Sequence, residues 1–351
     1  MEAILARFLR PRLRRVAPLP EIENLPIKVY PGRARPQIFS SGSVLTIGAF
    51  DGLHLGHQRI IERLKLKAKE LGLPSAAMSF RPDPAEYFLA QSVELEQAEM
   101  SQDCSILMSW RERMLALAAT GVDAVLCMPF NKAVSQMAAE DFVRELVHQL
   151  GMRYLLVGDD FQFGNGRQGD FRLLTKLGEE LGFQVEQSET HFHEGERISS
   201  TRVRKALAAG ELNHAEILLG RPYEICGRVI QGEQLGVQLG FPTANIALRR
   251  RRPAMGGVYA VIAEFPDGSN HKGVANLGIR PAVNSLEHPL LEVHLLDWSG
   301  DLYRQHLRVK FVKRLRDEKK FDSLAALKDA IKDDVRNARS WFDNQAISTS
   351  C

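Results

Sequence analysis

Residues 44–57 read VLTIGAFDGLHLGH, and this stretch decides the fold of the first half of the 351-residue chain. Its first five residues are the apolar run of a buried strand, and apolar residues then recur at helical spacing from Ile60 to Leu71. The glycine-rich part therefore lies where a strand ends and a helix begins. Glycines at such a turn let backbone amides approach phosphate, and a helix N-terminus favours anions. His54 and His57 are three residues apart and point the same way on a first helical turn, which suits stabilisation of a phosphoryl transition state.

The alternation of strands and helices continues beyond this stretch. Apolar runs typical of strands lie at 75–80, 124–128, 154–157 and 183–185, and helical periodicity lies between them at 114–119, 142–150 and 173–181. Strands that alternate with helices of this length predict a parallel sheet with helices on both faces. Ligands of such sheets bind beyond the carboxyl ends of the strands.

The pattern of predicted secondary structure changes after about residue 222. Short extended segments follow one another at 227–229, 258–264, 271–276, 291–296 and 307–312, separated by Gly, Pro and Asp. This pattern predicts an antiparallel barrel or sandwich, and a last helix follows it. The boundary between the two halves lies in the helical stretch 203–219.

Charge and composition exclude several classes of protein. The chain has 46 basic and 43 acidic residues, a net charge of +3, so we expect no nucleic-acid partner. No apolar run approaches the ~20 residues of a membrane span, so we expect no membrane insertion. The four cysteines are scattered, which predicts neither a zinc site nor a disulfide framework and favours the cytoplasm. Composition leaves the oligomeric state open.

Residues 1–42 form a proline-rich basic segment, which we interpret as an irregular arm. The arm is either solvated or in contact with RNA or acidic lipid. The basic run Arg249–Arg252 leaves the same alternatives open, a charged loop or a phosphate or RNA contact.

Two more motifs of the first half could contact a nucleotide or flavin. VGDDFQFGNGR at 157–167 again leaves a strand end, and Phe161 and Phe163 could bound a flat aromatic ligand, although a plain turn is the simpler interpretation. RISSTRVR at 197–204 combines hydroxyls at a helix start with arginines. The hydroxyls could only cap the helix, but the arginines favour a polyphosphate.

The second half carries two motifs. GVQLGFPTAN at 236–245 can wrap phosphates with backbone amides, and Thr243 and Asn245 offer oxygen ligands to Mg²⁺. LEVHL at 291–295 places Glu292 and His294 on one face of a strand. A glutamate on a strand is most often solvent-exposed, so the residue type alone does not predict a catalytic role for Glu292.

Taken together, GAFDGLHLGH, VGDDFQFGNGRQGD, RISSTRVR, GFPTAN, GVANLGIRP, LEVHLLD and LRDEKKF resemble the bifunctional riboflavin kinase/FMN adenylyltransferase family, over roughly residues 43–340. The resemblance implies a Rossmann-like FMN adenylyltransferase domain at 43–205, a linker region at 206–222 and a riboflavin kinase domain at 223–345 on a six-stranded antiparallel barrel. Riboflavin and ATP would give FMN, and FMN and ATP would give FAD and pyrophosphate, with Mg²⁺ as cofactor.

Site residues follow from the matched motifs. The resemblance implies catalytic roles for His54, His57 and, as general base, Glu292. ATP and its phosphates in adenylyl transfer are predicted to contact Gly48, Phe50, Asp51, Gly56, Arg197, Ser199, Ser200, Thr201 and Arg204. The flavin pocket is predicted at Asp160, Phe161 and Phe163, and the ATP site of the kinase at Gly232, Gly236, Gly240, Pro242, Thr243 and Asn245, of which Thr243 and Asn245 would hold the metal.

The chain departs from the family pattern at Asp83, where histidine is usual, and at Val237, Ala282 and Asn284 in the kinase half. The loss of an arginine at Val237 motivates an alternative, an adenylyltransferase with a decayed kinase barrel. The basic arm motivates another, a flavin-sensing or RNA-contacting regulator, which the intact HxGH pair disfavours.

Overall fold

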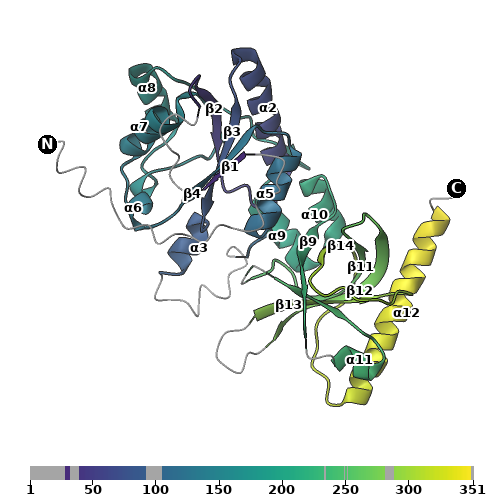
Figure 1. Ribbon diagram of the computed structural model, residues 1–351. Helices are drawn as coiled ribbons and strands as arrows, with labels where there is room; N and C mark the ends of the chain where they lie inside the picture. Colours follow the sequence, from purple (N-terminus) through teal and green to yellow (C-terminus); the bar gives the residue numbers. More distant parts are fainter. Residues whose placement is uncertain are drawn as a thin grey trace.

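The computed structural model describes residues 28–31, 39–91, 105–232, 235–248, 250, 252–280 and 288–348 of the chain. An α/β half is followed by a closed barrel and a long C-terminal helix (Figure 1). The predicted fold class is therefore confirmed. In the part of the chain that the structure describes, no helix is both long and apolar enough to cross a membrane.

The sheet of the first half has six strands in the order β1-β4-β3-β2-β5-β6, and every neighbouring pair is parallel. Their bounds are β1 Lys28–Pro31, β2 Ser43–Ile47, β3 Ser75–Arg81, β4 Ala124–Pro129, β5 Met152–Val157 and β6 Gln184–Gln187. The chain leaves β2 toward β3 on one side, and β5 lies on its other side. The loops after β2 and β5 therefore meet where the strand order reverses, which is the usual ligand position in such sheets.

Helices cover both faces of this sheet because its side chains alternate between two apolar clusters. Val44, Ala77 and Val125 face one cluster, whereas their neighbours Leu45 and Ala76 face the other. The first cluster is covered by α2 Leu55–Leu71, α5 Trp110–Ala119, α9 Ser200–Ala209 and α10 Leu212–Leu219. The second is covered by α7 Ala139–Leu150 and α8 Phe171–Leu181. Shorter elements are α3 Pro84–Leu89, α6 Lys132–Ser135, η2 Asn165–Arg167, β7 Phe192–His193 and β8 Glu196–Arg197.

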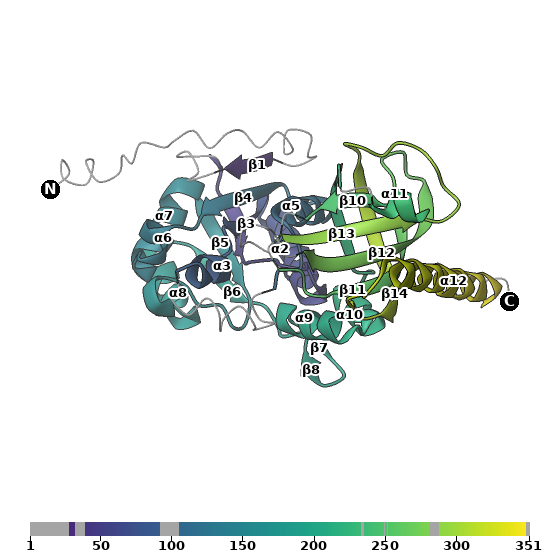
Figure 2. The ribbon, with the colours of Figure 1, turned by 90° about the horizontal axis from the view of Figure 1, so that it is seen from below.

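One part of the expected irregular arm is regular. Residues 28–31 form β1, which pairs with β4 in the register Lys28↔Ala124 and lies at the edge of the sheet (Figure 2). An edge strand can form in a proline-rich segment because only one of its sides carries hydrogen bonds to a neighbour. Residues 1–27 and 32–38, which include the basic run of the arm, lie outside the described residues.

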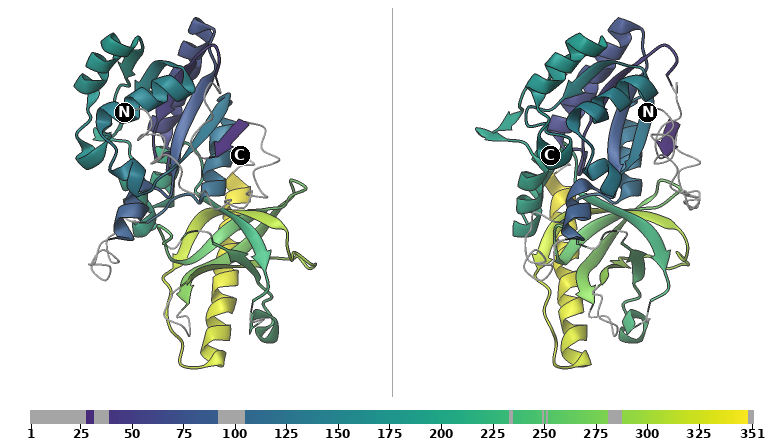
Figure 3. Two further views of the ribbon diagram at one scale, coloured as in Figure 1. Left: turned by 60° about the vertical axis from the view of Figure 1, so that its left-hand side comes forward. Right: turned by 90° about the vertical axis from the view of Figure 1, so that its left-hand side faces the viewer.

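The second half is a closed barrel in the order β10-β13-β12-β11-β14-β9, with antiparallel pairing throughout. Its strands are β9 Glu224–Ile230, β10 Ala244–Ala247, β11 Gly257–Glu264, β12 Asn270–Arg280, β13 His288–Leu295 and β14 His306–Arg316. The short helix α11 Leu235–Leu239 precedes β10, and the C-terminal helix α12 Leu324–Ser348 lies along the outside of the barrel (Figure 3). Ala338 and Phe342 of α12 pack there against Val258 and Ala260.

The two halves share one apolar cluster, because Leu107 and Leu117 of the first half and Ile225, Tyr259 and Phe311 of the barrel belong to it. The predicted linker is helical and packed, since α9 and α10 contribute buried residues to that cluster. The basic run at 249–252 is not a plain charged loop. Arg250 is 3% exposed and forms an ion pair with the buried Glu112 of α5. Arg249 and Arg251 lie outside the described residues.

Candidate active sites

The loop after β2 places both histidines of the HxGH motif at the N-terminus of α2. His54 is the N-cap residue of this helix, and its Nδ1 accepts a hydrogen bond from the backbone N–H of His57 at 3.4 Å. The two imidazole rings stack with centroids 3.8 Å apart, and the Phe50 ring contacts His57 edge-on. Because Nδ1 of His54 accepts a hydrogen bond, its proton resides on Nε2.

Both histidines are neutral at pH 7. Burial, helped by the positive charge of Arg197, lowers the pKa of His54 to about 4. Burial also lowers the pKa of His57 well below its usual range, with the neighbouring His54 as the next cause. Neutral imidazoles can donate one hydrogen bond each without adding charge to the site.

A cavity of about 1060 Å³ opens in front of these histidines. The loops after β2 and β5 and the segment before α9 line it, as the strand order requires. Of the residues predicted to bind nucleotide or flavin in the first half, the cavity wall contains Gly48, Phe50, His54, Gly56, His57, Asp160, Phe161, Phe163, Arg197, Ser199, Ser200 and Thr201.

Arg197 spans this cavity from β8 to the loop after β5. Its Nη2 lies 2.6 Å from Asp159 Oδ1 and 2.8 Å from Asp160 Oδ1, and its side chain is 39% exposed. An exposed ion pair of this kind contributes little stability. The guanidinium can therefore exchange its carboxylate partners for the phosphates of a ligand at small cost.

The hydroxyls at the start of α9 form hydrogen bonds within the protein. Ser199 is the N-cap residue of α9 and accepts a hydrogen bond from the backbone N–H of Arg202 at 3.2 Å. Ser200 donates from its hydroxyl to the carbonyl of Asp51 at 2.8 Å. Both residues nevertheless border the cavity, so helix capping and proximity to a ligand occur together in this segment.

Asp51 and Arg204 do not belong to the cavity wall, so their contact with the phosphates of ATP stays a prediction. Their side chains pair with each other, with Arg204 Nη2 at 2.7 Å from Asp51 Oδ2, and Arg204 Nε donates to the carbonyl of Ser105 at 2.6 Å. The Asp51 carboxylate also accepts the backbone N–H groups of Leu107 and Met108. With this many donors, the buried carboxylate of Asp51 is held in place as part of the loop.

Asp83, at the position where the family usually has histidine, is the N-cap residue of α3. Its Oδ1 accepts the backbone N–H of Ala85 at 3.0 Å, and its own N–H donates to Glu86 Oε2 at 3.2 Å. Oδ2 lies 3.5 Å from Nη1 of the buried Arg113, which also approaches Asp51 at 3.6 Å. The carboxylate is thus held by a capping box and an ion pair at the edge of the cavity.

Sequence reasoning missed the aromatic end of the cavity. Phe80, Tyr87, Phe88 and Phe130 pack edge-to-face with centroids 5.2–5.7 Å apart and border the same space. These residues come from β3, α3 and the residue after β4, so no run of sequence collects them. Phe163, in contrast, is 8% exposed and packs against Phe161, so most of its ring belongs to the core.

The second candidate site lies on the outer face of the barrel. Asn245 of β10 is directly opposite Glu292 of β13, and Glu292 is directly opposite Asn276 of β12. Opposite residues of antiparallel strands share a face, so the three polar side chains form one row. Leu291 and Val293, on the other face of β13, are fully buried inside the barrel. Asn276 was not predicted, since an asparagine in a strand has no distinctive spacing.

Helix α11 and the loop that follows it, residues 235–243, lie next to this row. Phe241 donates its backbone N–H to the carbonyl of Gly236 at 2.7 Å, and the carbonyl of Pro242 lies 2.9 Å from Nδ1 of His294. A Cβ at Gly236 would collide with the Phe241 carbonyl, and a Cβ at Gly232 would collide with the amide of Asn245. The glycines of this motif therefore let the backbone approach the row closely.

The residues predicted to hold Mg²⁺ fit that ion. Asn245 is 6% exposed, and its Oδ1 has no hydrogen-bond partner among the described residues. A buried amide oxygen of this kind is an expected feature of a site for a hard cation. Thr243 precedes Asn245 by two residues, and its hydroxyl lies 3.2 Å from the position that a Cβ on Gly236 would take.

Two of the four departures from the family pattern lie in the described residues. Val237, on α11, is 59% exposed, so an arginine there would extend from a surface position. Ala282 and Asn284 fall between residues 281 and 287, outside the described residues.

Comparison with known proteins finds a family for each half of the chain. The FAD synthetase family matches residues 37–202, and the riboflavin kinase family matches residues 219–342. A bifunctional riboflavin kinase/FMN adenylyltransferase from Pseudomonas fluorescens is 47% identical over 300 residues, 85% of this chain and 93% of that protein. The protein of the same description from Escherichia coli K12 is 43% identical over 302 residues, 86% of this chain and 93% of its own length.

A solved structure described as a macrolide-efflux protein from Streptococcus pneumoniae is similar in fold. It superposes with a TM-score of 0.73 at 27% identity, and the match covers 90% of this chain and 100% of that one. The arrangement of an α/β half and a barrel is thus shared over nearly the whole chain.

Proposed function

The chain belongs to the bifunctional riboflavin kinase/FMN adenylyltransferase family, and from that premise we propose how its residues divide the two reactions. The enzyme makes FMN from riboflavin and ATP, and FAD from FMN and ATP. We assign adenylyl transfer to the cavity of the first half and phosphorylation of riboflavin to the polar row of the barrel. The observation that carries the assignment is the pair of neutral histidines in the wall of the 1060 Å³ cavity.

In adenylyl transfer, a phosphate oxygen of FMN attacks the α-phosphorus of ATP, and the bond to the departing pyrophosphate breaks. His54 donates from Nε2–H to a phosphate oxygen, because its Nδ1 is occupied as an acceptor. His57 lies against His54 and supplies the second donor. Arg197 leaves Asp159 and Asp160 and neutralises the charge that develops on the leaving group.

The flavin ring of FMN occupies the aromatic end of the same cavity. Phe80, Tyr87, Phe88 and Phe130 supply flat apolar surface there, and the side chain of Phe88 is exposed. Large aromatic surfaces bind flat aromatic ligands through stacked or edge-to-face contacts. Phe161 and Asp160 line the same cavity, which supports their predicted place in the flavin pocket.

In the kinase half, Glu292 accepts the proton of the ribityl hydroxyl as that oxygen attacks the γ-phosphorus of ATP, and the bond from this phosphorus to the departing ADP breaks. Its position opposite Asn245 supports this role, because the base and the metal-binding side chains then share one face of the barrel. Thr243 and Asn245 would hold Mg²⁺, which supplies charge neutralisation at the phosphates. Val237 gives little reason to infer a decayed kinase, since its side chain is largely solvent-exposed. The cytoplasm remains our proposed location, supported by the free thiols of Cys127 and Cys226.

Two substitutions test the division. His57→Ala removes one donor of the cavity, and we expect FAD formation to fall ~10²–10³-fold while riboflavin phosphorylation continues, so that FMN accumulates. Glu292→Ala removes the base, and phosphorylation should fall ~10²–10⁴-fold while added FMN is still converted to FAD. Both steps are assayed in both variants. If each variant impairs both steps equally and retains its circular dichroism, the assignment of one reaction to each half is wrong.

A further inference from the structure

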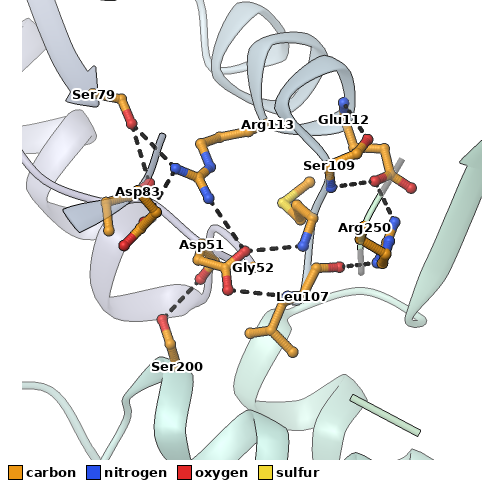
Figure 4. Close-up of polar contacts among 12 residues, drawn as sticks. Asp51, Gly52, Ser79, Asp83, Leu107, Ser109, Glu112, Arg113, Ser200 and Arg250 are labelled. Carbon is orange, nitrogen blue, oxygen red and sulfur yellow. Dashed lines mark hydrogen bonds and ion pairs between the residues drawn. The ribbon is translucent and has the colours of Figure 1, made fainter. Parts of the chain in front are cut away.

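A buried chain of polar contacts connects the barrel to the HxGH loop of the other half. It passes through residues 105–109, which we name the bridging segment, and reaches the barrel at Arg250 (Figure 4). None of the sequence motifs includes the bridging segment, and Arg250 belongs to a run whose role was left open.

On the barrel side, Arg250 holds the bridging segment by a carbonyl. Its Nη1 donates to the Leu107 carbonyl at 2.5 Å and to the Tyr223 hydroxyl at 2.9 Å, and the Tyr223 hydroxyl donates to the same carbonyl at 3.0 Å. Its Nη2 forms an ion pair with Glu112, whose other oxygen accepts the backbone N–H of Cys226 at 2.6 Å. The guanidinium is thus fixed in direction by several partners at once.

On the other side, the HxGH loop holds the same segment by its amides. Asp51 Oδ2 accepts the N–H of Leu107 at 3.0 Å, and Oδ1 accepts the N–H of Met108 at 2.9 Å. Asp51 stands three residues before His54, and its carbonyl accepts the hydroxyl of Ser200. The loop between Asp51 and His54 contains residues with positive φ, Gly52 at 79° and Leu53 at 41°, so its shape depends on being held.

The backbone of Leu107 is therefore hydrogen-bonded to both halves: its carbonyl accepts from Arg250, and its N–H donates to Asp51. Both Arg250 and Asp51 are 3% exposed, so water does not replace either contact when one is lost. We propose that Arg250, a residue of the kinase half, is a positioning residue for adenylyl transfer in the other half. It holds the bridging segment, the bridging segment holds Asp51, and Asp51 sets the course of the loop that presents His54 and His57. The inference rests on the proposed adenylyl-transfer site.

The test uses the full-length enzyme and measures both reactions in each sample. Arg250→Met keeps the length of the side chain and removes its donors, and Arg250→Lys restores one donor. Since displacement of a reacting group by about 1 Å can cost ~10²-fold in rate, we expect Arg250→Met to lower kcat of adenylyl transfer at least ~10-fold, with KM for FMN changed less than kcat. Riboflavin phosphorylation should stay within about threefold, and Arg250→Lys should recover part of the lost kcat.

The control is Arg339→Met, which breaks another arginine–carboxylate pair of the second half. Arg339 lies on α12 and makes a bidentate contact of 2.7 Å with the carboxylate of Asp297. We expect both reactions of this variant to match the parent. His57→Ala is assayed in parallel. If it leaves adenylyl transfer intact, the proposed site fails; if it abolishes adenylyl transfer while Arg250→Met does not, only the positioning role fails.

The proposal is overturned if folded Arg250→Met converts FMN to FAD at the parent rate. It is also overturned if both reactions fall together in proportion to the folded fraction measured by circular dichroism, since a merely structural role predicts that result. Should Arg250→Met not fold, Tyr223→Phe removes a single hydroxyl from the Leu107 carbonyl and leaves the ion pair intact. A selective fall of about threefold or more in adenylyl-transfer kcat then supports the proposal, and an unchanged kcat refutes it.

Discussion

His54 has two functions that a pair of substitutions can separate. It caps α2 through Nδ1, and it lines the cavity, where we propose that its Nε2–H is the donor. His54→Asn keeps a short side chain that caps a helix at least as well, but the amide is too short to reach the position of Nε2. His54→Ala removes the cap and the donor together. The same loss of rate should therefore accompany two different losses of stability.

The magnitudes follow from the contacts. Loss of an N-cap to alanine costs about 1 kcal/mol of the free energy of unfolding, whereas asparagine should stay within about 0.5 kcal/mol of the parent. Loss of a donor at a developing oxyanion lowers the rate by ~10²–10³-fold. His54 lies 6% exposed beside an open cavity, so water can fill the space that its ring leaves. We therefore expect that an unfilled space in place of the ring adds little to the loss of stability in either variant.

Urea unfolding gives the stabilities, and conversion of FMN to FAD gives the rates, with riboflavin phosphorylation as the internal control. The expected pattern is a stable, slow His54→Asn enzyme and a less stable, equally slow His54→Ala enzyme, both with parent-like phosphorylation. A fast His54→Asn enzyme would refute the donor role of Nε2–H. Equal destabilisation of the two variants would refute the capping role.

Three further results are expected. The free energy of unfolding should decrease as the pH falls from about 6.5 toward 4, because the unfolded chain binds a proton at His54 while the folded chain, with a pKa of about 4, does not. The loss is at most about 3 kcal/mol, and urea titrations should show a smaller loss in His54→Asn than in the parent. An identical pH dependence of the two proteins would count against the role of His54. Val237 is 59% exposed, so Val237→Arg should change KM for ATP in riboflavin phosphorylation by less than about threefold. A larger decrease in this KM would show that the valine weakens ATP binding in the kinase half. Thr243→Val should stop phosphorylation and spare adenylyl transfer, whereas excess EDTA should stop both reactions; turnover in EDTA would exclude a divalent cation.

The sequence carried enough information for both architectures. In Val44–Ile47 and the helix after it, local periodicity and tertiary burial agree, so the parallel sheet could be predicted from apolar spacing alone. The barrel was predictable for the related reason that its short strands are separated by Gly, Pro and Asp. Strand β1 was not, because four residues of a proline-rich segment carry no periodic signal and pair only with a strand about 95 positions later.

The site was predictable only where its residues are neighbours in the chain. His54, His57 and Arg197 belong to compact motifs, and the structure brings them to one cavity. The aromatic end of that cavity comes from separate elements, and only the fold collects it. Asp51 and Arg204 have the residue types of a phosphate site, but in the structure the buried Asp51 carboxylate pairs with the partly buried Arg204. Such pairing depends on distance in space, which spacing along the chain does not give.

The ion pair between Glu112 and Arg250 also bears on how the protein is made. The two residues are separated by 138 positions in the sequence, and both are buried in the finished protein. At a synthesis rate of about 5–20 residues per second, the segment that supplies Arg250 leaves the ribosome roughly 7–30 s after Glu112. During that interval the carboxylate and the apolar surface of Leu107 and Leu117 have no barrel to cover them. The first half therefore exposes this apolar face during synthesis until the barrel strands are available to cover it.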